Sequence, residues 1–493
     1  MHSLKKLLAG MGWQGLKFSV VPVAASPAAP ARSLPLSRPA DPQRGAVRID
    51  LDTLRKMARN ADFDAFRDAW PKAPLDGANA VSPKTLYLLV AETELAAGDH
   101  ARLAEATSIL INGFDAREGH YYQALSNFLR GQYDAAIKRL ECTVYRHPGY
   151  VEAAVLLAKA FRDAGQSEAA WRTLEALLPQ FDDVAIWSAM ARLVHSQADF
   201  TRMHDHFQRR THHHPANAHD RPTVADKNPL EYLALGALRV NNFVVATQVW
   251  EDLLRQLAAS PPEAPRAAEP VVAEYSSRRA QLALIDLRRT LEGAGVPMFL
   301  VSGTLLGCVR EDRLLGHDHD VDVGVWDNVD RDRMLSILRT AGFFYDQASR
   351  APEIVRVKHV NGIVVDIFYH FRSPGDYWHR GVKIVWHNSP FGLATRAFLG
   401  EEFLIPDDYD KYLTENYGDW RTPKIDFDCA FDTPNAEVVN RDELLIHTYK
   451  MLAQAMAGGA RHRVAFSLDR LKEMGRENFV AELARQLRIG EPA

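Results

Sequence analysis

A short segment of small, polar and aromatic residues recurs at a near-even spacing in the first half of the chain. Residues 131–136 read Gly-Gln-Tyr-Asp-Ala-Ala, and residues 165–170, 34 positions later, read Gly-Gln-Ser-Glu-Ala-Ala. Weaker copies begin at Gly98, 33 positions before the first, and at Ala198, 33 positions after the second. Apolar residues around each copy follow helical spacing. The repeat predicts stacked pairs of antiparallel helices, because one pair alone could not bury its apolar face.

These segments resemble the tetratricopeptide repeat, which combines a Gly-x-Tyr-x-x-Ala turn with a closing proline, here Pro148. The resemblance implies an α-solenoid over residues 48–257, and an unrelated helical bundle is the alternative. Residues 1–47 contain a patchy apolar run followed by several prolines. We expect a disordered leader with one short amphipathic helix there, and a poor signal sequence is the alternative.

A chain of 493 residues exceeds the size of about 250–300 residues at which single cores stop growing, so we expect several domains. Residues 258–272 are rich in Pro and Ala, which predicts a linker.

The balance of 59 Lys and Arg against 63 Asp and Glu gives no electrostatic case for a nucleic-acid partner. Three widely separated cysteines favour a reducing compartment. No apolar run approaches the roughly 18–20 residues that span a bilayer, and we expect a cytoplasmic protein.

After the linker the pattern changes to short β-branched and aromatic runs mixed with helices. A helix is expected over residues 273–293, and strands are expected at 298–301, 319–326, 354–360, 363–370 and 382–386. Residues 273–440 are therefore predicted to form an α+β domain with a mixed sheet. Residues 441–493 return to helical spacing and are predicted to form a C-terminal helical extension.

Residues 316–326 contain the closest grouping of candidate catalytic and metal-binding side chains in the chain. With side chains alternating along a strand, Asp318, Asp320 and Asp322 share one face and valines occupy the other. Three like charges on one strand repel, and a bound cation usually relieves such repulsion. Carboxylate oxygens favour Mg²⁺ or Mn²⁺. An edge strand with solvated aspartates is the alternative.

Two further segments support a metal-dependent reaction. Asp366 is a single carboxylate within an apolar strand, where it needs a partner such as a shared metal. Ser302, Gly303 and Thr304 connect a strand to a helix whose free N–H groups can hold a phosphate. A phosphate site beside a carboxylate-bound metal is typical of phosphoryl or nucleotidyl transfer.

Four ordered motifs then resemble the LicD/fukutin family. They are residues 302–310, the Asp-x-Asp-x-Asp of residues 318–322, residues 365–368, and residues 405–423 with Tyr417 and Trp420. The resemblance implies a nucleotidyltransferase-type fold that moves a phosphorylated alcohol, such as phosphocholine or a polyol phosphate, from a CDP-activated donor to a glycan hydroxyl. It also implies that Asp320, Asp322 and Asp366 are the metal and catalytic carboxylates. Many bacterial members have Pro-Trp-Asp-Asp-Asp where residues 316–320 read Gly-His-Asp-His-Asp, so the sequence leaves the donor open.

We assign expected roles to the remaining motif residues. Asp318 is a third ligand, or it orients Arg310 or a histidine. Ser302, Gly303 and Thr304 cradle phosphate, with Gly303 allowing close backbone approach. Arg310 binds phosphate or forms a salt bridge to the Asp strand. The aromatic residues Tyr417 and Trp420 line the donor pocket or pack the C-terminal loop.

The 19 histidines are a compositional oddity. Residues 204–219 contain six of them, and such tracts can bind metal. A solvated loop between repeats is the alternative that we favour, because no paired cysteines accompany them. His317 and His319 flank the carboxylates and are candidates for contact with substrate or with a ligand aspartate.

The sequence thus predicts a metal-dependent phosphotransferase that modifies cell-surface glycans such as lipopolysaccharide or capsule. Its helical repeats would dock a protein partner or a long acceptor, and any membrane association would be peripheral, at the inner face. Two other readings stay open. One is an assembly adaptor with an inactive C-terminal domain, and the other is a nucleotidyltransferase that passes on a nucleoside monophosphate.

Overall fold

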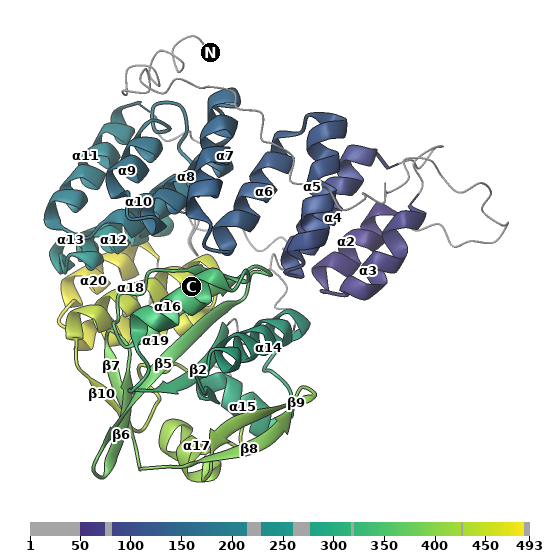
Figure 1. The fold of residues 1–493 in the computed structure, drawn as a ribbon. Helices are drawn as coiled ribbons and strands as arrows, with labels where there is room; N and C mark the ends of the chain where they lie inside the picture. The colour runs from purple at the N-terminus through teal and green to yellow at the C-terminus, as the bar shows by residue number, and fades with distance from the viewer. Residues whose placement is uncertain are drawn as a thin grey trace.

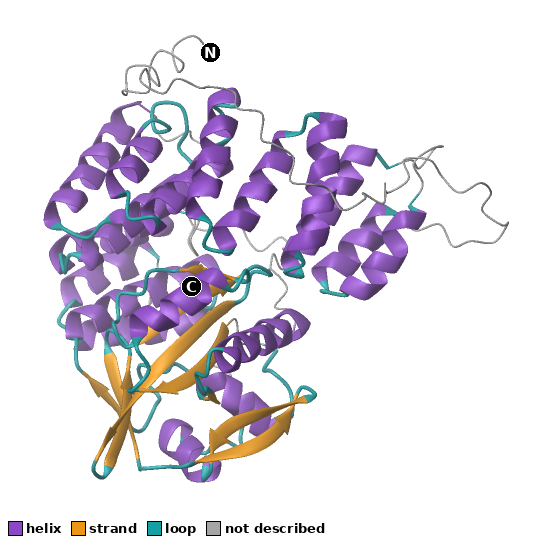
Figure 2. Ribbon diagram, in the orientation of Figure 1, coloured by secondary structure: helices purple, strands orange, loops and turns teal. Residues whose placement is uncertain are grey.

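The computed structural model describes residues 50–73, 81–213, 228–259, 277–316, 320–424 and 427–487. Helices form the upper half of the molecule and one large sheet lies below them (Figure 1). Figure 2 shows the strands gathered on one side of the repeat helices. Among the helices of these ranges, none is both long and apolar enough to cross a membrane.

The first half of the chain forms a curved stack of helix pairs, which confirms the predicted solenoid. Neighbouring helices pack in sequence order, and Gly98 and Gly165 lie in the turns within two of the pairs with φ of 68° and 77°. This left-handed backbone is strained for any residue with a Cβ, which explains glycine at these turns. The helices are α2 (Leu51–Arg59), α3 (Phe63–Ala69), the 3-10 helix η2 (Trp70–Lys72), α4 (Pro83–Ala96), α5 (His100–Phe114), α6 (Arg117–Leu129), α7 (Tyr133–Arg146), α8 (Val151–Asp163), α9 (Ser167–Glu175), α10 (Val184–Leu193), α11 (Gln197–His213), α12 (Pro229–Arg239) and α13 (Phe243–Ala259).

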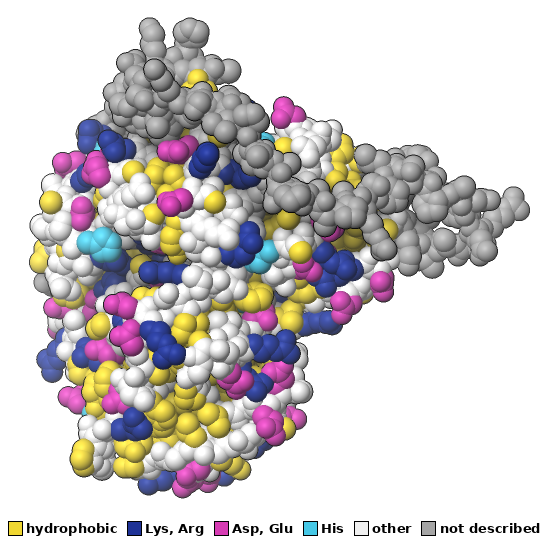
Figure 3. Space-filling view, in the orientation of Figure 1, with side chains coloured by type: hydrophobic (Ala, Val, Ile, Leu, Met, Phe, Trp, Pro, Cys, Tyr) yellow, Lys and Arg dark blue, Asp and Glu magenta, His cyan; other side chains and the backbone are white. Residues whose placement is uncertain are grey.

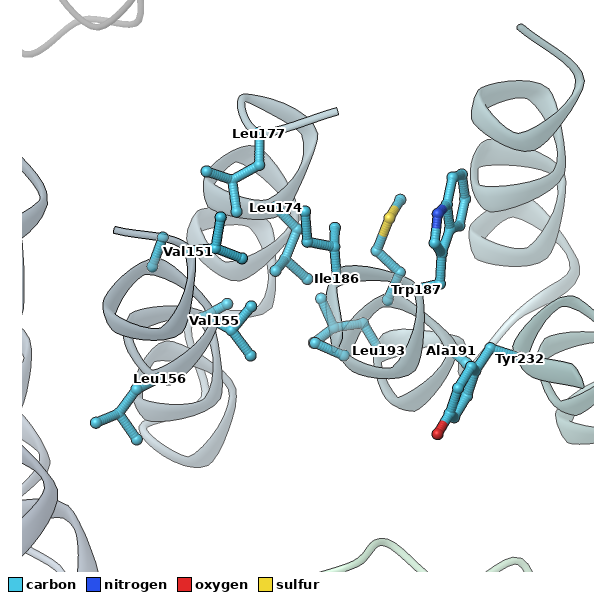
Figure 4. Close-up of a cluster of buried hydrophobic side chains, with 14 of the residues drawn as sticks. Val151, Val155, Leu156, Leu174, Leu177, Ile186, Trp187, Ala191, Leu193 and Tyr232 are labelled. Carbon is cyan, nitrogen blue, oxygen red and sulfur yellow. The ribbon is translucent and has the colours of Figure 1, made fainter. Parts of the chain in front are cut away.

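The repeat core is continuous from pair to pair. Val155 of α8, Leu174 of α9 and Ile186 of α10 converge between three helices (Figure 4). Beside them, Trp187 is 1% exposed, and its indole N–H donates to Asp182 Oδ1 at 3.0 Å. Burying each large apolar side chain contributes about 1.5–3 kcal/mol. The stacking of pairs therefore supplies the core that no pair has alone.

The C-terminal residues return to the repeats. Helices α18 (Arg441–Ala457), α19 (Arg461–Glu473) and α20 (Glu477–Gln486) share the hydrophobic core of the solenoid and pack beside α13 (Figure 1). The Tyr449 hydroxyl donates to Glu251 Oε1 at 2.7 Å, and Arg255 pairs with Glu482 at 2.8 Å. The segment predicted as a helical extension thus covers the last repeat pair.

The sheet between these helical parts is mixed, as predicted. Its main order is β10-β7-β6-β5-β2-β1-β9-β8, with β4 also paired to β5 and β3 paired to β4. The pairs β2–β5 and β1–β9 are parallel and the others are antiparallel. The strands are β1 (Phe299–Leu300), β2 (Asp320–Trp326), β3 (Phe344–Asp346), β4 (Ile354–His359), β5 (Val364–Ser373), β6 (Asp376–Arg380), β7 (Ile384–Asn388), β8 (Leu393–Phe398), β9 (Glu401–Pro406) and β10 (Ala436–Val438).

Four helices accompany this sheet: α14 (Ser277–Gly293), α15 (Ser302–Arg310), α16 (Arg331–Thr340) and α17 (Tyr409–Tyr417). Leu287 of α14 and Leu338 of α16 join one core with Val321, Val323 and Ile367 of the central strands. Because side chains alternate along a strand, the intervening residues of β2 lie on the opposite face. That face carries the aspartates.

The repeat turns contact the sheet domain directly. An ideal Cβ on Gly98 would lie 2.1 Å from the Phe343 ring, so the turn and the ring are in close contact. Gly342 N donates to Leu129 O at 3.0 Å, and the Gly342 carbonyl lies 2.9 Å from His100 Nε2. The segment between α16 and β4 is therefore held by the edge of the solenoid.

Candidate active site

Three carboxylates converge on adjacent parallel strands. The register pairs Asp322 of β2 with Asp366 of β5, and Asp320 lies two residues earlier on the same face of β2. One oxygen of each carboxylate lies within 4.8 Å of the others. Asp366 is only 3% exposed, whereas Asp320 and Asp322 are partly exposed. The arrangement matches the predicted cluster, and tertiary pairing brings together residues 44 positions apart.

Asp318 and the two histidines beside it, His317 and His319, lie outside the described residues. Within the described ranges, Asp320, Asp322 and Asp366 form the one group of at least three His, Cys, Asp or Glu side chains that could hold a metal. Three carboxylates and no soft ligand are a donor set that fits Mg²⁺ or Mn²⁺.

The Ser-Gly-Thr segment lies beside the acidic strand at the start of α15. Thr304 Oγ1 accepts a hydrogen bond from Asp322 N at 2.8 Å, and the Thr304 side chain is buried. Ser302 adopts φ of 49°, a strained conformation that concentrates at functional sites. Ser302 and Gly303 begin the helix, where backbone N–H groups lack helical partners. This turn can therefore approach a phosphate.

Arg310 and the two C-terminal aromatic residues are engaged in packing. Arg310 Nη1 donates to Trp420 O at 3.3 Å and Nη2 donates to Glu311 at 3.1 Å, so neither of these bonds reaches the Asp strand. Trp420 is 7% exposed, and Tyr417 lies 5.0 Å from the Phe427 ring. Of the two roles expected for these aromatics, the observed contacts correspond to packing of the C-terminal loop.

Sequence reasoning missed Arg356, which contacts the cluster directly. The antiparallel register of β4 and β5 sets Arg356 opposite Asp366, and its guanidinium donates to both carboxylate oxygens, with Nε to Oδ1 at 2.6 Å. This hydrogen-bonded pair, and then the charges of Asp320 and Asp322, raise the pKa of Arg356. In the sequence, Arg356 and Lys358 alternate with apolar residues along β4. This alternation could have indicated that both cations lie on the polar face of the strand, the face that carries the aspartates.

Residues far along the chain also approach the site. Cys429 is exposed as a residue, although neighbouring groups pack around its thiol. This packing raises the pKa of the thiol, the carboxylates of Asp428, Asp322 and Asp320 act in the same direction, and Lys383 lowers it. The Asp428 carboxylate in turn bonds His447 Nε2 of α18 at 3.2 Å. The C-terminal segment thus adds polar groups beside the aspartates.

The histidine tract shows ordinary contacts where it is described. On α11, His206 Nε2 lies 2.9 Å from Glu175 Oε1, and His204 lies 3.2 Å from the Gln208 amide. Residues 214–219 lie outside the described ranges.

Comparisons with known proteins agree with this geometry. Residues 295–408 match the LicD/FKTN/FKRP nucleotidyltransferase domain, and residues 128–193 match the tetratricopeptide repeat. The protein named "Ribitol-5-phosphate transferase FKTN" from Mus musculus is 24% identical over 170 residues, which are 32% of this chain and 37% of that protein. Its Homo sapiens counterpart is 23% identical over 171 residues, with the same coverage. The alignments span little more than a third of the length of these curated relatives. All three converging aspartates lie inside the matched domain.

Proposed function

We propose that this chain, which carries a LicD/FKTN/FKRP-type nucleotidyltransferase domain and tetratricopeptide-like repeats, transfers a phosphorylated alcohol from a CDP-activated donor to a glycan hydroxyl. The observation that carries the proposal is the convergence of Asp320, Asp322 and Asp366 beside the start of α15. The relatives are named as ribitol-5-phosphate transferases, which favours ribitol 5-phosphate as the transferred group.

In the proposed reaction the acceptor oxygen forms a bond to the donor's distal phosphorus, and the bond from that phosphorus to CMP breaks. Asp320 and Asp322 would hold Mg²⁺ or Mn²⁺, which when bound neutralises charge on the diphosphate. Asp366 would take the proton of the acceptor hydroxyl or share the metal. Arg356 would orient Asp366, because its guanidinium engages both oxygens of that carboxylate.

The start of α15 would orient the donor phosphates. Ser302 and Gly303 offer backbone N–H groups at a helix start, where anions are favoured. Thr304 would keep this turn against β2, because its hydroxyl already accepts from Asp322 N. The turn and the carboxylates would thus act on the same diphosphate.

The test uses the full chain with CDP-ribitol, CDP-glycerol and CDP-choline in turn, with Mg²⁺. Release of CMP from one of them supports phospho-alcohol transfer. Asp320→Ala combined with Asp366→Asn should lower this release by at least about 100-fold. Asp332→Asn is the matched control, because Asp332 is exposed on α16 away from the cluster, and it should leave the rate unchanged. A folded double variant that still consumes the donor would contradict the proposed mechanism.

Transfer of a nucleoside monophosphate is the second candidate, favoured by the nucleotidyltransferase character of the matched domain. The leaving group separates the two, because nucleotidyl transfer releases pyrophosphate rather than CMP. An inactive adaptor is disfavoured by the retained cluster of mutually repelling carboxylates, since a site without a ligand gains nothing from that repulsion.

The repeats would then position the acceptor glycan, or a protein partner that delivers it, at the inner face of a membrane. Part of the repeat edge already contacts the sheet domain through Gly98 and Gly342. A protein partner would therefore use other surfaces of the solenoid. Fractionation of the full chain with and without membranes tests the proposed peripheral location.

A further inference from the structure

Two arginine side chains of the repeats cross to the sheet domain. Lys and Arg side chains lie at several points along the junction of the two domains on the face drawn in Figure 3. Arg192 of α10 donates from Nη1 to the carbonyl of Gln347 at 2.6 Å, and Arg239 of α12 donates from Nη1 to the carbonyl of Ala348 at 2.9 Å. The Nε of Arg239 also donates to Val194 O within the repeats at 2.8 Å. Two consecutive carbonyls that follow β3 are therefore held by two different repeat helices.

The segment that these arginines hold has a strained backbone. Ala348 has φ of 50°, in the left-handed region that residues with a Cβ rarely adopt. Its N–H donates to Asp346 Oδ1 at 2.7 Å, and the other oxygen of that carboxylate pairs with Arg339 of α16. A strained conformation persists only where its surroundings determine it. The turn after β3 is therefore fixed jointly by the sheet domain and by the repeats.

The same turn is hydrogen-bonded to β4 at Arg356. Gln347 N donates to Arg356 O at 3.0 Å, directly after the antiparallel pairs that β3 forms with β4. Strand β4 in turn pairs with β5, where Arg356 lies opposite Asp366. A continuous path of hydrogen bonds therefore runs from Arg192 through the Gln347 peptide groups to Arg356 and Asp366.

The side chain of Arg356 is not confined by packing. It is 50% exposed, whereas the side chain of Asp366 is 4% exposed. Forming two hydrogen bonds restricts the rotamers of a long exposed side chain, so the position of its backbone decides whether the guanidinium reaches both carboxylate oxygens. A displacement of about 1 Å can lower a catalytic rate about 100-fold. The two-bond pair of Arg356 with Asp366 therefore depends on a fixed position of β4.

We propose that Arg192 and Arg239 are positioning residues, which hold the turn after β3 and thereby set β4 so that Arg356 engages Asp366. The repeats are then a part of the catalytic unit, in addition to any role in docking. The effect on turnover rests on the proposed function. The coupling of the two repeat arginines to the pair of Arg356 with Asp366 does not.

A double-mutant cycle on thermal unfolding of the full chain in EDTA tests this coupling without any substrate. Arg356→Ala should lower the Tm of the wild type. In a chain with Arg192→Met and Arg239→Met, it should lower the Tm by less than about half as much, because the pair with Asp366 is already misplaced. Methionine keeps much of the apolar stem of arginine. Arg192→Met alone replaces the double variant if the latter does not fold, and the decrease should again be smaller than in the wild type.

Arg146→Met supplies the matched background, because Arg146 is an exposed arginine of α7. In that background Arg356→Ala should lower the Tm as it does in the wild type. Equal decreases in all backgrounds would overturn the proposal, since residues that do not interact have additive effects.

Donor turnover gives a second readout. Arg192→Met with Arg239→Met should lower kcat at least about fivefold and change KM for the donor by less than about twofold, because the arginines act through Arg356 and not on the donor. Arg192→Lys with Arg239→Lys retains donors for the two carbonyls and should recover most of the lost kcat. An unchanged kcat, or a rise in KM alone, would overturn the proposal.

The two readouts separate this inference from the proposed function. A wild type that consumes no CDP-activated donor contradicts the proposed function, whereas additive Tm decreases contradict the positioning of Arg356 by the repeats. The unfolding cycle contains no donor, so its result does not depend on whether the chain transfers phospho-alcohols.

Discussion

Arg356 of β4 donates hydrogen bonds to both carboxylate oxygens of Asp366 of β5, directly across an antiparallel pair of strands. Asp366 in turn stands opposite Asp322 of β2. One row across three strands therefore contains a cation and two carboxylates. We therefore expect the free energy of unfolding to change when Arg356 is removed or when a cation binds the carboxylates.

Arg356→Ala should lower the free energy of unfolding by about 2 kcal/mol, because Asp366 is buried and would lose its partner. If the proposed metal binds at Asp366, the guanidinium would compete with it for that carboxylate. Mg²⁺ should therefore raise the Tm of Arg356→Ala by more than it raises the wild-type Tm. Calorimetry with and without Mg²⁺ measures both effects, and equal Mg²⁺ shifts in the two proteins would contradict competition at Asp366.

Asp320→Asn should stabilise the metal-free protein by about 1 kcal/mol while abolishing donor turnover. The three carboxylates lie within 4.8 Å, so neutralising one relieves repulsion. The increase in Tm caused by Mg²⁺ should be smaller than in the wild type. Thermal unfolding in EDTA and in Mg²⁺ checks this, with Asp332→Asn as the charge-matched control. A variant less stable than the wild type in EDTA would refute the repulsion argument.

Thr304→Val should cost about 1–3 kcal/mol, because the N–H of Asp322 would lose its acceptor in a buried setting. Thr304→Ser keeps the hydroxyl and should recover most of this loss. Urea unfolding of the two variants measures the difference. If the Thr304→Val and Thr304→Ser variants are equally stable, the hydrogen bond does not hold α15 to β2.

Gly98→Ala should destabilise the protein more than Gly165→Ala. Both glycines have positive φ, so alanine strains both turns by about 1 kcal/mol. At Gly98 the new Cβ would also collide with Phe343, whereas at Gly165 nothing lies within 4 Å. Denaturant unfolding measures the free energy that each variant loses. The additional loss in Gly98→Ala over Gly165→Ala measures the contact between the repeat turn and the sheet domain. Phe343→Ala should abolish the excess in a double variant, and an unchanged excess would place the strain elsewhere.

Stability should rise with pH because of Lys159. Its folded pKa of about 8 lies below the ordinary lysine value of 10.5, so between these values the unfolded chain holds a proton that the folded chain lacks. Deprotonation therefore favours the folded state as pH rises through this window. The charged groups facing Lys159 are Arg162 and Asp163 of α8, Arg192 of α10 and Lys358 of β4.

The measurement compares wild type with Lys159→Met in urea at pH 7 and pH 9.5. The wild type should gain up to about 1 kcal/mol per pH unit relative to the variant. Groups common to both proteins cancel in this comparison. If the unfolding free energy of the variant changes with pH as that of the wild type does, Lys159 is protonated alike in the folded and unfolded states.

Local sequence patterns predicted much of the architecture. Near-even spacing of the Gly-centred turns predicted the solenoid, because each turn needs the same backbone conformation wherever it occurs. Alternation in residues 319–326 predicted a strand with Asp320 and Asp322 on one face, as β2 has it. The short strands β3, β6, β8, β9 and β10 were not predicted, since partly exposed strands such as β8 carry a weaker apolar pattern.

The sequence by itself determined the periodicities: which residues form helix pairs, which form strands, and which aspartates share a face. Tertiary structure alone decided the partners. The opposition of Arg356 and Asp366 depends on strand register. The approach of Cys429 to Asp322 and Asp320, and that of Lys159 to Lys358, depend on how distant segments pack. Local pattern fixes the direction of a side chain within its element, but long-range packing decides what lies opposite it.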